Sequence, residues 1–186
     1  MKRTSLIVSV FMALFLARVC ADPFTDPVEH IPGGISMEKL SSGTVRDEPA
    51  NPPITIDPGE VLITNDSFRP PIEITIVAKT DSTNLRISYT AAQVIFNWEL
   101  NKTQLRVDGG PADGKHQSNK GLIPVDTYVT IRWDVTDTHE SIYVDDDLRF
   151  HNSADYSKIN NQISVFGGAG STLKVTSLTT KYLEKK

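Results

Sequence analysis

Polar residues at alternating positions in the middle of the chain could together bind a ligand. The set comprises Arg86, Asn97, Glu99, Arg106 and Asp108. Each belongs to a short segment in which polar and apolar residues alternate, so a sheet built from these segments would gather them on one face. Carboxylates and amides accept hydrogen bonds, and guanidinium groups donate them in a fork, which suits a ligand rich in hydroxyl groups. The alternative is a solvated face with cross-strand ion pairs and no ligand.

A long connection could close over one end of this face. Residues 109–124 (GGPADGKHQSNKGLIP) have almost no apolar content before Leu122. Loops of this length inside a compact domain are usually functional or disordered. We therefore expect a binding loop around His116, which would act together with Arg86, Asn97, Glu99 and Arg106. A mobile surface loop without a ligand is the alternative.

No other pattern predicts catalysis or a cofactor. Four histidines are scattered along the chain without the spacing of metal ligands: His30, His116, His139 and His151. The single cysteine, Cys20, and the lack of a G-x-S-x-G sequence leave nucleophilic catalysis without support. Three adjacent aspartates at residues 145–147 could offer oxygens to calcium, but they lack the Gly-containing EF-hand loop. We expect no catalytic residue, metal or cofactor, with a calcium ion as the alternative.

The chain from about residue 54 onward consists of short alternating segments separated by turn residues. This pattern predicts roughly ten to twelve strands, and no segment has a helical period. Two sheets with one apolar face each would pack against one another, so we predict an all-β, antiparallel β-sandwich. A barrel is the alternative architecture. The apolar positions predict that four side chains lie in the core: Phe96, Trp98, Ile131 and Trp133.

The first residues have the features of a secretory signal peptide. Two basic residues precede an apolar run at residues 6–17, which is shorter than the about 20 residues that span a bilayer. Val19 and Ala21 predict cleavage after Ala21, which would leave no transmembrane segment and a secreted or periplasmic protein. A buried N-terminal helix, or lipidation at Cys20, is the alternative. The expected organisation is a signal peptide (1–21), an extended Pro- and Gly-rich lead-in (22–42) and one β-sandwich domain (43–186).

The charge of the chain argues against nucleic acid as a partner. The formal net charge is −4, from 19 basic and 23 acidic residues. Cleavage after Ala21 would remove three basic and no acidic residues, which leaves a net charge of −7. Binding to phosphates depends on clustered Lys and Arg, and anionic membrane surfaces are disfavoured for the same reason.

The segment 128–150 resembles a hairpin of the concanavalin A-like lectin/glucanase superfamily, the jelly-roll group that includes laminin-G-like domains. It has a strand with central Trp133, then Ile-Tyr-Val-Asp at residues 142–145, and a turn into a further strand. Asp146 replaces the usual Gly, which predicts a looser turn or one of another type. The last strand, from Leu173, is similar to the one that pairs back with the first in this group. The chain also looks like uncharacterised bacterial members.

The resemblance implies a carbohydrate or a cell-surface partner as the ligand. The glucanase signature E-x-D-x-x-E, which supplies the paired carboxylates of glycoside hydrolysis, fails at Glu99, because Leu100 and Asn101 follow it. We therefore expect an exported, non-catalytic binding domain and not an enzyme. Two alternatives stay open: a polysaccharide lyase or hydrolase without that signature, and a structural or interaction domain with no small ligand.

Overall fold

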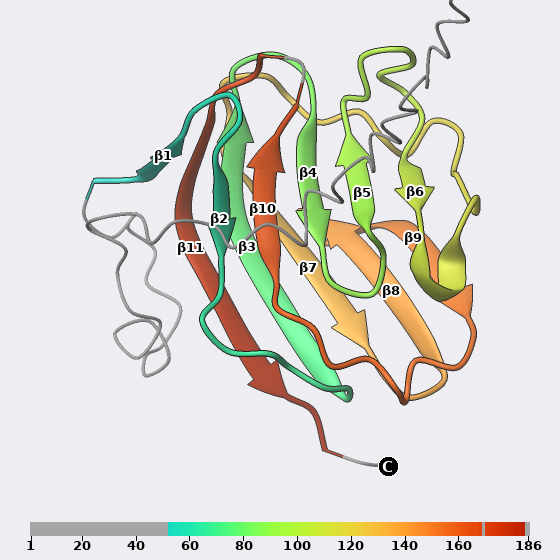
Figure 1. Ribbon diagram of the computed structural model, residues 1–186. Coiled ribbons are helices and arrows are strands. Elements are labelled where there is room, and N and C mark those ends of the chain that lie inside the picture. Colours follow the sequence, from blue (N-terminus) through green and yellow to red (C-terminus); the bar gives the residue numbers. More distant parts are fainter. Residues whose placement is uncertain (1–51, 169, 185–186) are drawn as a thin grey trace, which may run out of the picture. The chain divides into compact units, whose positions relative to one another are not determined.

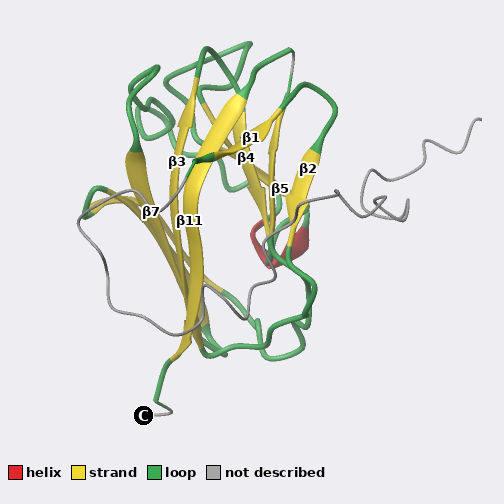
Figure 2. Cartoon of the chain, turned by 90° about the vertical axis from the view of Figure 1, so that its left-hand side faces the viewer, coloured by secondary structure: helices red, strands yellow, loops and turns green. Residues whose placement is uncertain are grey.

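Two antiparallel sheets form the described part of the chain, residues 52–168 and 170–184 of the computed structural model. The six-stranded sheet has the order β1-β11-β3-β7-β8-β9 and the five-stranded sheet the order β2-β10-β4-β5-β6. Figure 1 shows the five-stranded sheet in front, and Figure 2 shows the two layers from the side. The strands are β1 (Ile54–Ile56), β2 (Val61–Ile63), β3 (Ile72–Thr80), β4 (Leu85–Ser88), β5 (Gln93–Phe96), β6 (Arg106–Asp108), β7 (Val129–Val135), β8 (His139–Val144), β9 (Asp147–Ser153), β10 (Ser164–Gly167) and β11 (Leu173–Tyr182).

The core lies between the sheets and follows from the alternation. In β3 every second residue is buried, beginning with Ile72, and the residues between them are half-buried on the outer face. The prediction of a β-sandwich is therefore confirmed. Phe96, Ile131 and Trp133 are at most 1% exposed, as predicted. The pairing of the last strand with the first is also confirmed, because β11 pairs with β1.

The β8–β9 hairpin is tighter than the sequence predicted. Val144 pairs with Asp147, so only Asp145 and Asp146 form the turn. Both have positive φ, 47° and 64°, the backbone pattern of a two-residue type I′ turn. Aspartate tolerates this left-handed conformation better than most residues do, and the Asp145 carboxylate also accepts a hydrogen bond from the Thr130 N–H at 2.8 Å. The prediction of a looser turn was wrong.

The predicted signal peptide and lead-in, residues 1–42, lie outside the described residues, as does the start of the predicted domain at residue 43. Among the residues that the structure describes, no helix has the length and apolar character needed to cross a membrane.

Candidate functional site

A row of side chains crosses the outer face of the five-stranded sheet. The register places Val61 of β2, Phe166 of β10, Arg86 of β4, Ile95 of β5 and Arg106 of β6 beside one another. This face lies toward the viewer in Figure 1. Ile95 is 1% exposed although it does not belong to the core between the sheets. The two flanking arginines therefore lie over an apolar floor. We call this outer face of β2, β10, β4, β5 and β6, with the side chains that lie on it, the front face.

Arg86 is held at the centre of the front face by several partners. Its Nε and Nη2 donate to the Asn84 side-chain oxygen at 3.2 and 2.9 Å, and its Nη1 donates to Gln93 Oε1 at 3.0 Å. Its Nη2 also lies 3.6 Å from a Glu99 carboxylate oxygen. Asn84 is itself fully buried with φ 56°, so this anchor is part of the fold. The guanidinium group consequently has one fixed orientation.

The network continues to the edge of the sheet. Gln93 Nε2 donates to the Asp108 carboxylate at 2.9 Å, and Arg106 Nε donates to the same carboxylate at 2.7 Å. The Arg106 guanidinium lies over the Trp98 ring, 4.4 Å from its centroid, in cation–π geometry. Strands β4, β5 and β6 thus present one connected set of donors, acceptors and an aromatic ring.

Gly168 leaves room for the Arg86 guanidinium group because it has no side chain. A Cβ atom at Gly168 would lie 2.6 Å from the Arg86 guanidinium carbon and nitrogens. Gly168 follows β10, the strand that pairs with β4. The backbone at residue 168 can therefore approach the arginine closely only because this residue has no side chain.

Asn97 is not on the front face, contrary to the prediction. It is fully buried, with φ 50°. Its amide donates to the Ile123 carbonyl and accepts from the Ile123 N–H, both at 3.0 Å. Because both polar atoms of the side chain are used to hold the 109–124 segment, Asn97 has a structural role and cannot bind a ligand without breaking these bonds.

The left-handed residue at position 97 also changes the direction of the next side chains. Strict alternation would place Trp98 in the core with Phe96. Strand β5 ends at Phe96, however, and Trp98 is half-buried under Arg106. The prediction that Trp98 is a core residue was wrong, and the turn brings an aromatic ring and Glu99 to the front face instead.

The 109–124 segment lies along the edge of the sheet. Leu105 and Gln117 exchange backbone hydrogen bonds at 2.9 Å, and the Gly121 N–H donates to the Thr103 carbonyl at 2.9 Å. The His116 Nδ1 accepts from the Val107 N–H at 3.1 Å. The segment therefore satisfies the backbone of edge strand β6. Within the described residues no hydrogen bond or ion pair joins His116 to Arg86, Glu99 or Arg106, so the structure does not bring His116 into the front-face network.

A second carboxylate of interest is buried between the sheets. Glu140 of β8 is 1% exposed. It accepts hydrogen bonds from the Thr90 hydroxyl at 2.5 Å, the Trp133 indole N–H at 3.0 Å and the Tyr156 hydroxyl at 2.8 Å. Burial raises the pKa of the Glu140 carboxyl, and these hydrogen bonds oppose the rise. The carboxylate has a structural role in the core, because it is buried and all three of these donors are side chains of the protein.

Sequence reasoning found part of the front face and missed part of it. Arg86, Glu99 and Arg106 lie on it as predicted. Phe166 could have been found by alternation, because its neighbour Val165 is a core residue. The position of Trp98 on the front face could not have been found, because nothing in the regular alternation of this segment signals the left-handed conformation of Asn97.

Comparisons with known proteins identify the fold. No protein-family model and no curated protein matches the chain. A galectin of Caenorhabditis elegans is 12% identical, with a TM-score of 0.50 over 80% of this chain and 100% of the galectin. A Bacillus licheniformis β-glucanase is 10% identical, with a TM-score of 0.53 over 71% of this chain and 78% of the enzyme.

A further similar structure comes from work on endo-acting O-glycanases of human gut bacteria. It is 11% identical, with a TM-score of 0.54 over 71% of this chain and 80% of that one. At such identities the matches establish architecture and not activity. Together with the two antiparallel sheets, they show that this chain has the concanavalin A-like jelly-roll fold.

Proposed function

We propose that this protein is an exported, non-catalytic domain that binds carbohydrate on the front face. The observation that carries the proposal is a connected network of polar side chains beside the aromatic rings of Trp98 and Phe166. Its members are Arg86, Gln93, Glu99, Asp108 and Arg106. A free glycan or the glycan of a cell-surface partner would supply the same chemistry. The similar structures named for a galectin and for glycan-acting enzymes support the choice of ligand class.

The chemistry of the front face suits a sugar. Hydroxyl groups both donate and accept, so a ligand with several neighbouring hydroxyls can use carboxylate acceptors and guanidinium donors at once. Sugars also have apolar C–H faces, which pack against aromatic rings such as Trp98 and Phe166. Because Arg86 and Arg106 are already held by side-chain hydrogen bonds, binding would cost little ordering of these groups.

A glycan array followed by titration tests the proposal. Take the glycan with the strongest response and measure its affinity for the parent, Glu99→Ala, Arg106→Ala and Trp98→Ala. We expect each change to weaken binding about tenfold or more, the effect of losing a central contact worth about 1.4 kcal/mol. If all three variants bind as tightly as the parent, the front face is not the site.

The opposite sheet offers a matched control. Arg132 pairs with Asp134 and lies over the Tyr143 ring, 4.0 Å from its centroid, which repeats the Arg106, Asp108 and Trp98 arrangement. Arg132→Ala should leave glycan affinity unchanged. Incubation of the parent with a panel of polysaccharides should release no product, and product release would favour the lyase or hydrolase alternative.

Export is a separate part of the proposal. The basic residues, the apolar run and the small residues before Asp22 support cleavage after Ala21. N-terminal sequencing of the exported protein should give Asp22 as the first residue. A chain that begins at a lipidated Cys20, or that keeps Met1, would contradict this.

A further inference from the structure

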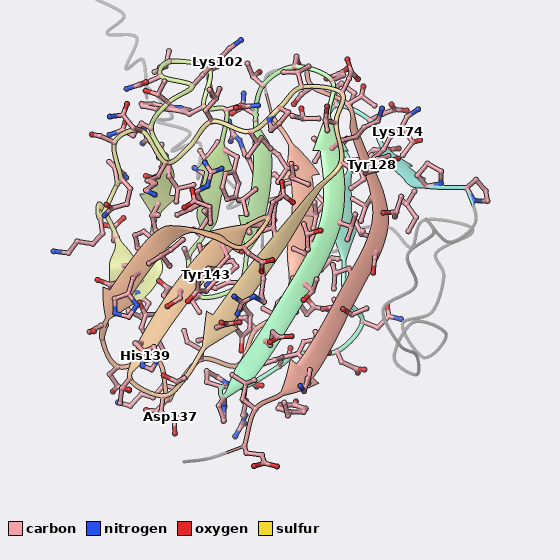
Figure 3. The ribbon with its side chains drawn as sticks, turned by 180° about the vertical axis from the view of Figure 1, so that it is seen from behind. Lys102, Tyr128, Asp137, His139, Tyr143 and Lys174 are labelled. Carbon is pink, nitrogen blue, oxygen red and sulfur yellow. The ribbon has the colours of Figure 1, made fainter. Side chains whose placement is uncertain are left out.

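Two histidines lie side by side on the outer face of the six-stranded sheet, far from the front face. His139 begins β8, and His151 belongs to the neighbouring β9. The register pairs Ser141 with His151 and His139 with Ser153, so the two histidines are diagonal neighbours on one face. Their ring centroids are 5.7 Å apart and their planes are inclined by 43°. Figure 3 shows His139 near one end of this face, at the β7–β8 turn.

Each ring is oriented by a hydrogen bond at Nδ1. His151 Nδ1 lies 2.9 Å from the Ser141 hydroxyl, and His139 Nδ1 lies 2.9 Å from the Thr136 hydroxyl. Either neutral tautomer fits these distances, and a metal at Nε2 selects the one that carries its proton on Nδ1. Histidines that bind metals are usually oriented in this way by a partner at the second nitrogen.

The separation of the rings suits a shared ion. With a metal–nitrogen distance of about 2.0–2.1 Å, two imidazoles on one tetrahedral ion have centroids about 5.3 Å apart. The observed separation is within half an ångström of this value, which small side-chain rotations can supply. The carboxylate of Asp134 lies on the same face, directly opposite Ser141, and one of its buried oxygens has no hydrogen-bond partner. Its other oxygen pairs with Arg132, which already balances its charge, so the two histidines are the metal-binding groups of this site.

We propose that His139 and His151 bind one divalent transition-metal ion through their Nε2 atoms. Imidazole ligands suit Zn²⁺, Cu²⁺ and Ni²⁺ better than Ca²⁺ or Mg²⁺. The part of the chain that the structure describes contains no group of three or more metal-binding side chains. Water or a group from another molecule therefore completes the coordination, and the site is open.

Calorimetric titration of the untagged protein with zinc chloride tests this. The parent should bind one Zn²⁺, and His139→Ala and His151→Ala should each weaken binding by about tenfold or more. Ser141→Ala, which removes only the orienting hydroxyl, should also weaken it, by about tenfold. His116→Ala is the matched control and should bind Zn²⁺ as the parent does. The EPR spectrum of the Cu²⁺-loaded parent should show coupling to two imidazole nitrogens.

Three outcomes would overturn the proposal. The first is that the parent releases no heat with excess Zn²⁺. The second is that both histidine variants bind Zn²⁺ as tightly as the parent does, and the third is that only one of the two variants binds more weakly. Melting curves of the metal-free variants show whether they fold. Because both side chains lie on the outer face, we expect these curves to match the parent.

Discussion

Replacement of Glu140 by alanine should lower the free energy of unfolding more than the loss of any other single polar side chain in the described core. The carboxylate accepts from the Thr90 hydroxyl, the Trp133 indole and the Tyr156 hydroxyl. Removing it leaves three buried donors without an acceptor. An unsatisfied buried group costs about 1–3 kcal/mol. The three losses share one cavity and are not independent, so we expect a total of about 3–5 kcal/mol, similar to breaking a buried ionic contact.

Urea unfolding followed by tryptophan fluorescence measures this change, because the Trp133 indole contacts the carboxylate directly. Tyr156→Phe removes one donor and should cost about 1 kcal/mol. In the double variant Glu140→Ala/Tyr156→Phe, the loss of unfolding free energy should be smaller than the sum of the two single losses, since no Tyr156 hydroxyl is left without an acceptor. If Glu140→Ala lowers the free energy of unfolding by less than about 1 kcal/mol, the three hydrogen bonds do not stabilise the core as argued.

The same residue predicts a pH dependence. Burial raises the pKa of Glu140 above its ordinary value of 4.5 in the folded protein. The folded state therefore holds the proton more tightly than the unfolded state, and this contribution to stability is fully present below pH 4.5 and is lost as the pH rises through the folded-state pKa. Glu140→Gln cannot titrate. The unfolding free energy of the parent relative to this variant should fall as the pH rises over that range, and a difference that grows with pH would contradict the assignment.

Three further substitutions test the packing and the front face. Trp133→Ala should cost about 3–5 kcal/mol by urea unfolding, and an unchanged melting temperature would show that the ring is not a core residue. Asn97→Ala should destabilise by about 1–3 kcal/mol, since it removes both hydrogen bonds to Ile123 at a left-handed position; Asn97→Gly, which tolerates the positive φ, should cost less than Asn97→Ala. Gly168→Ala should displace the Arg86 guanidinium from its hydrogen bonds to Asn84 and Gln93, so it should weaken glycan binding and lower the free energy of unfolding by about 1 kcal/mol; unaltered binding would mean that the position of Arg86 is unimportant.

The amino-acid sequence alone determined the architecture and most of the core. Alternation in segments such as 72–80 and 129–135 requires each strand to have one apolar face, and two sheets can hide such faces only against each other. The same rule placed Arg86 and Arg106 on a polar surface, whereas Glu99 reaches it from the turn after β5. These predictions hold because alternation in a strand is a local property, set by the direction in which successive side chains point.

Only the tertiary structure decided which residues act together. Asn97 takes a left-handed conformation because its amide binds Ile123, which lies far along the chain, and this contact turns Trp98 outward. His139 and His151 have no metal-ligand spacing in the sequence and meet only because β8 and β9 pair. Glu140 shares the alternation of its apolar neighbours, yet a carboxylate in the core is stable only with donors that come from β7, the β4–β5 turn and the segment after β9. Contacts between distant segments, and not local preferences, therefore set the candidate sites of this protein.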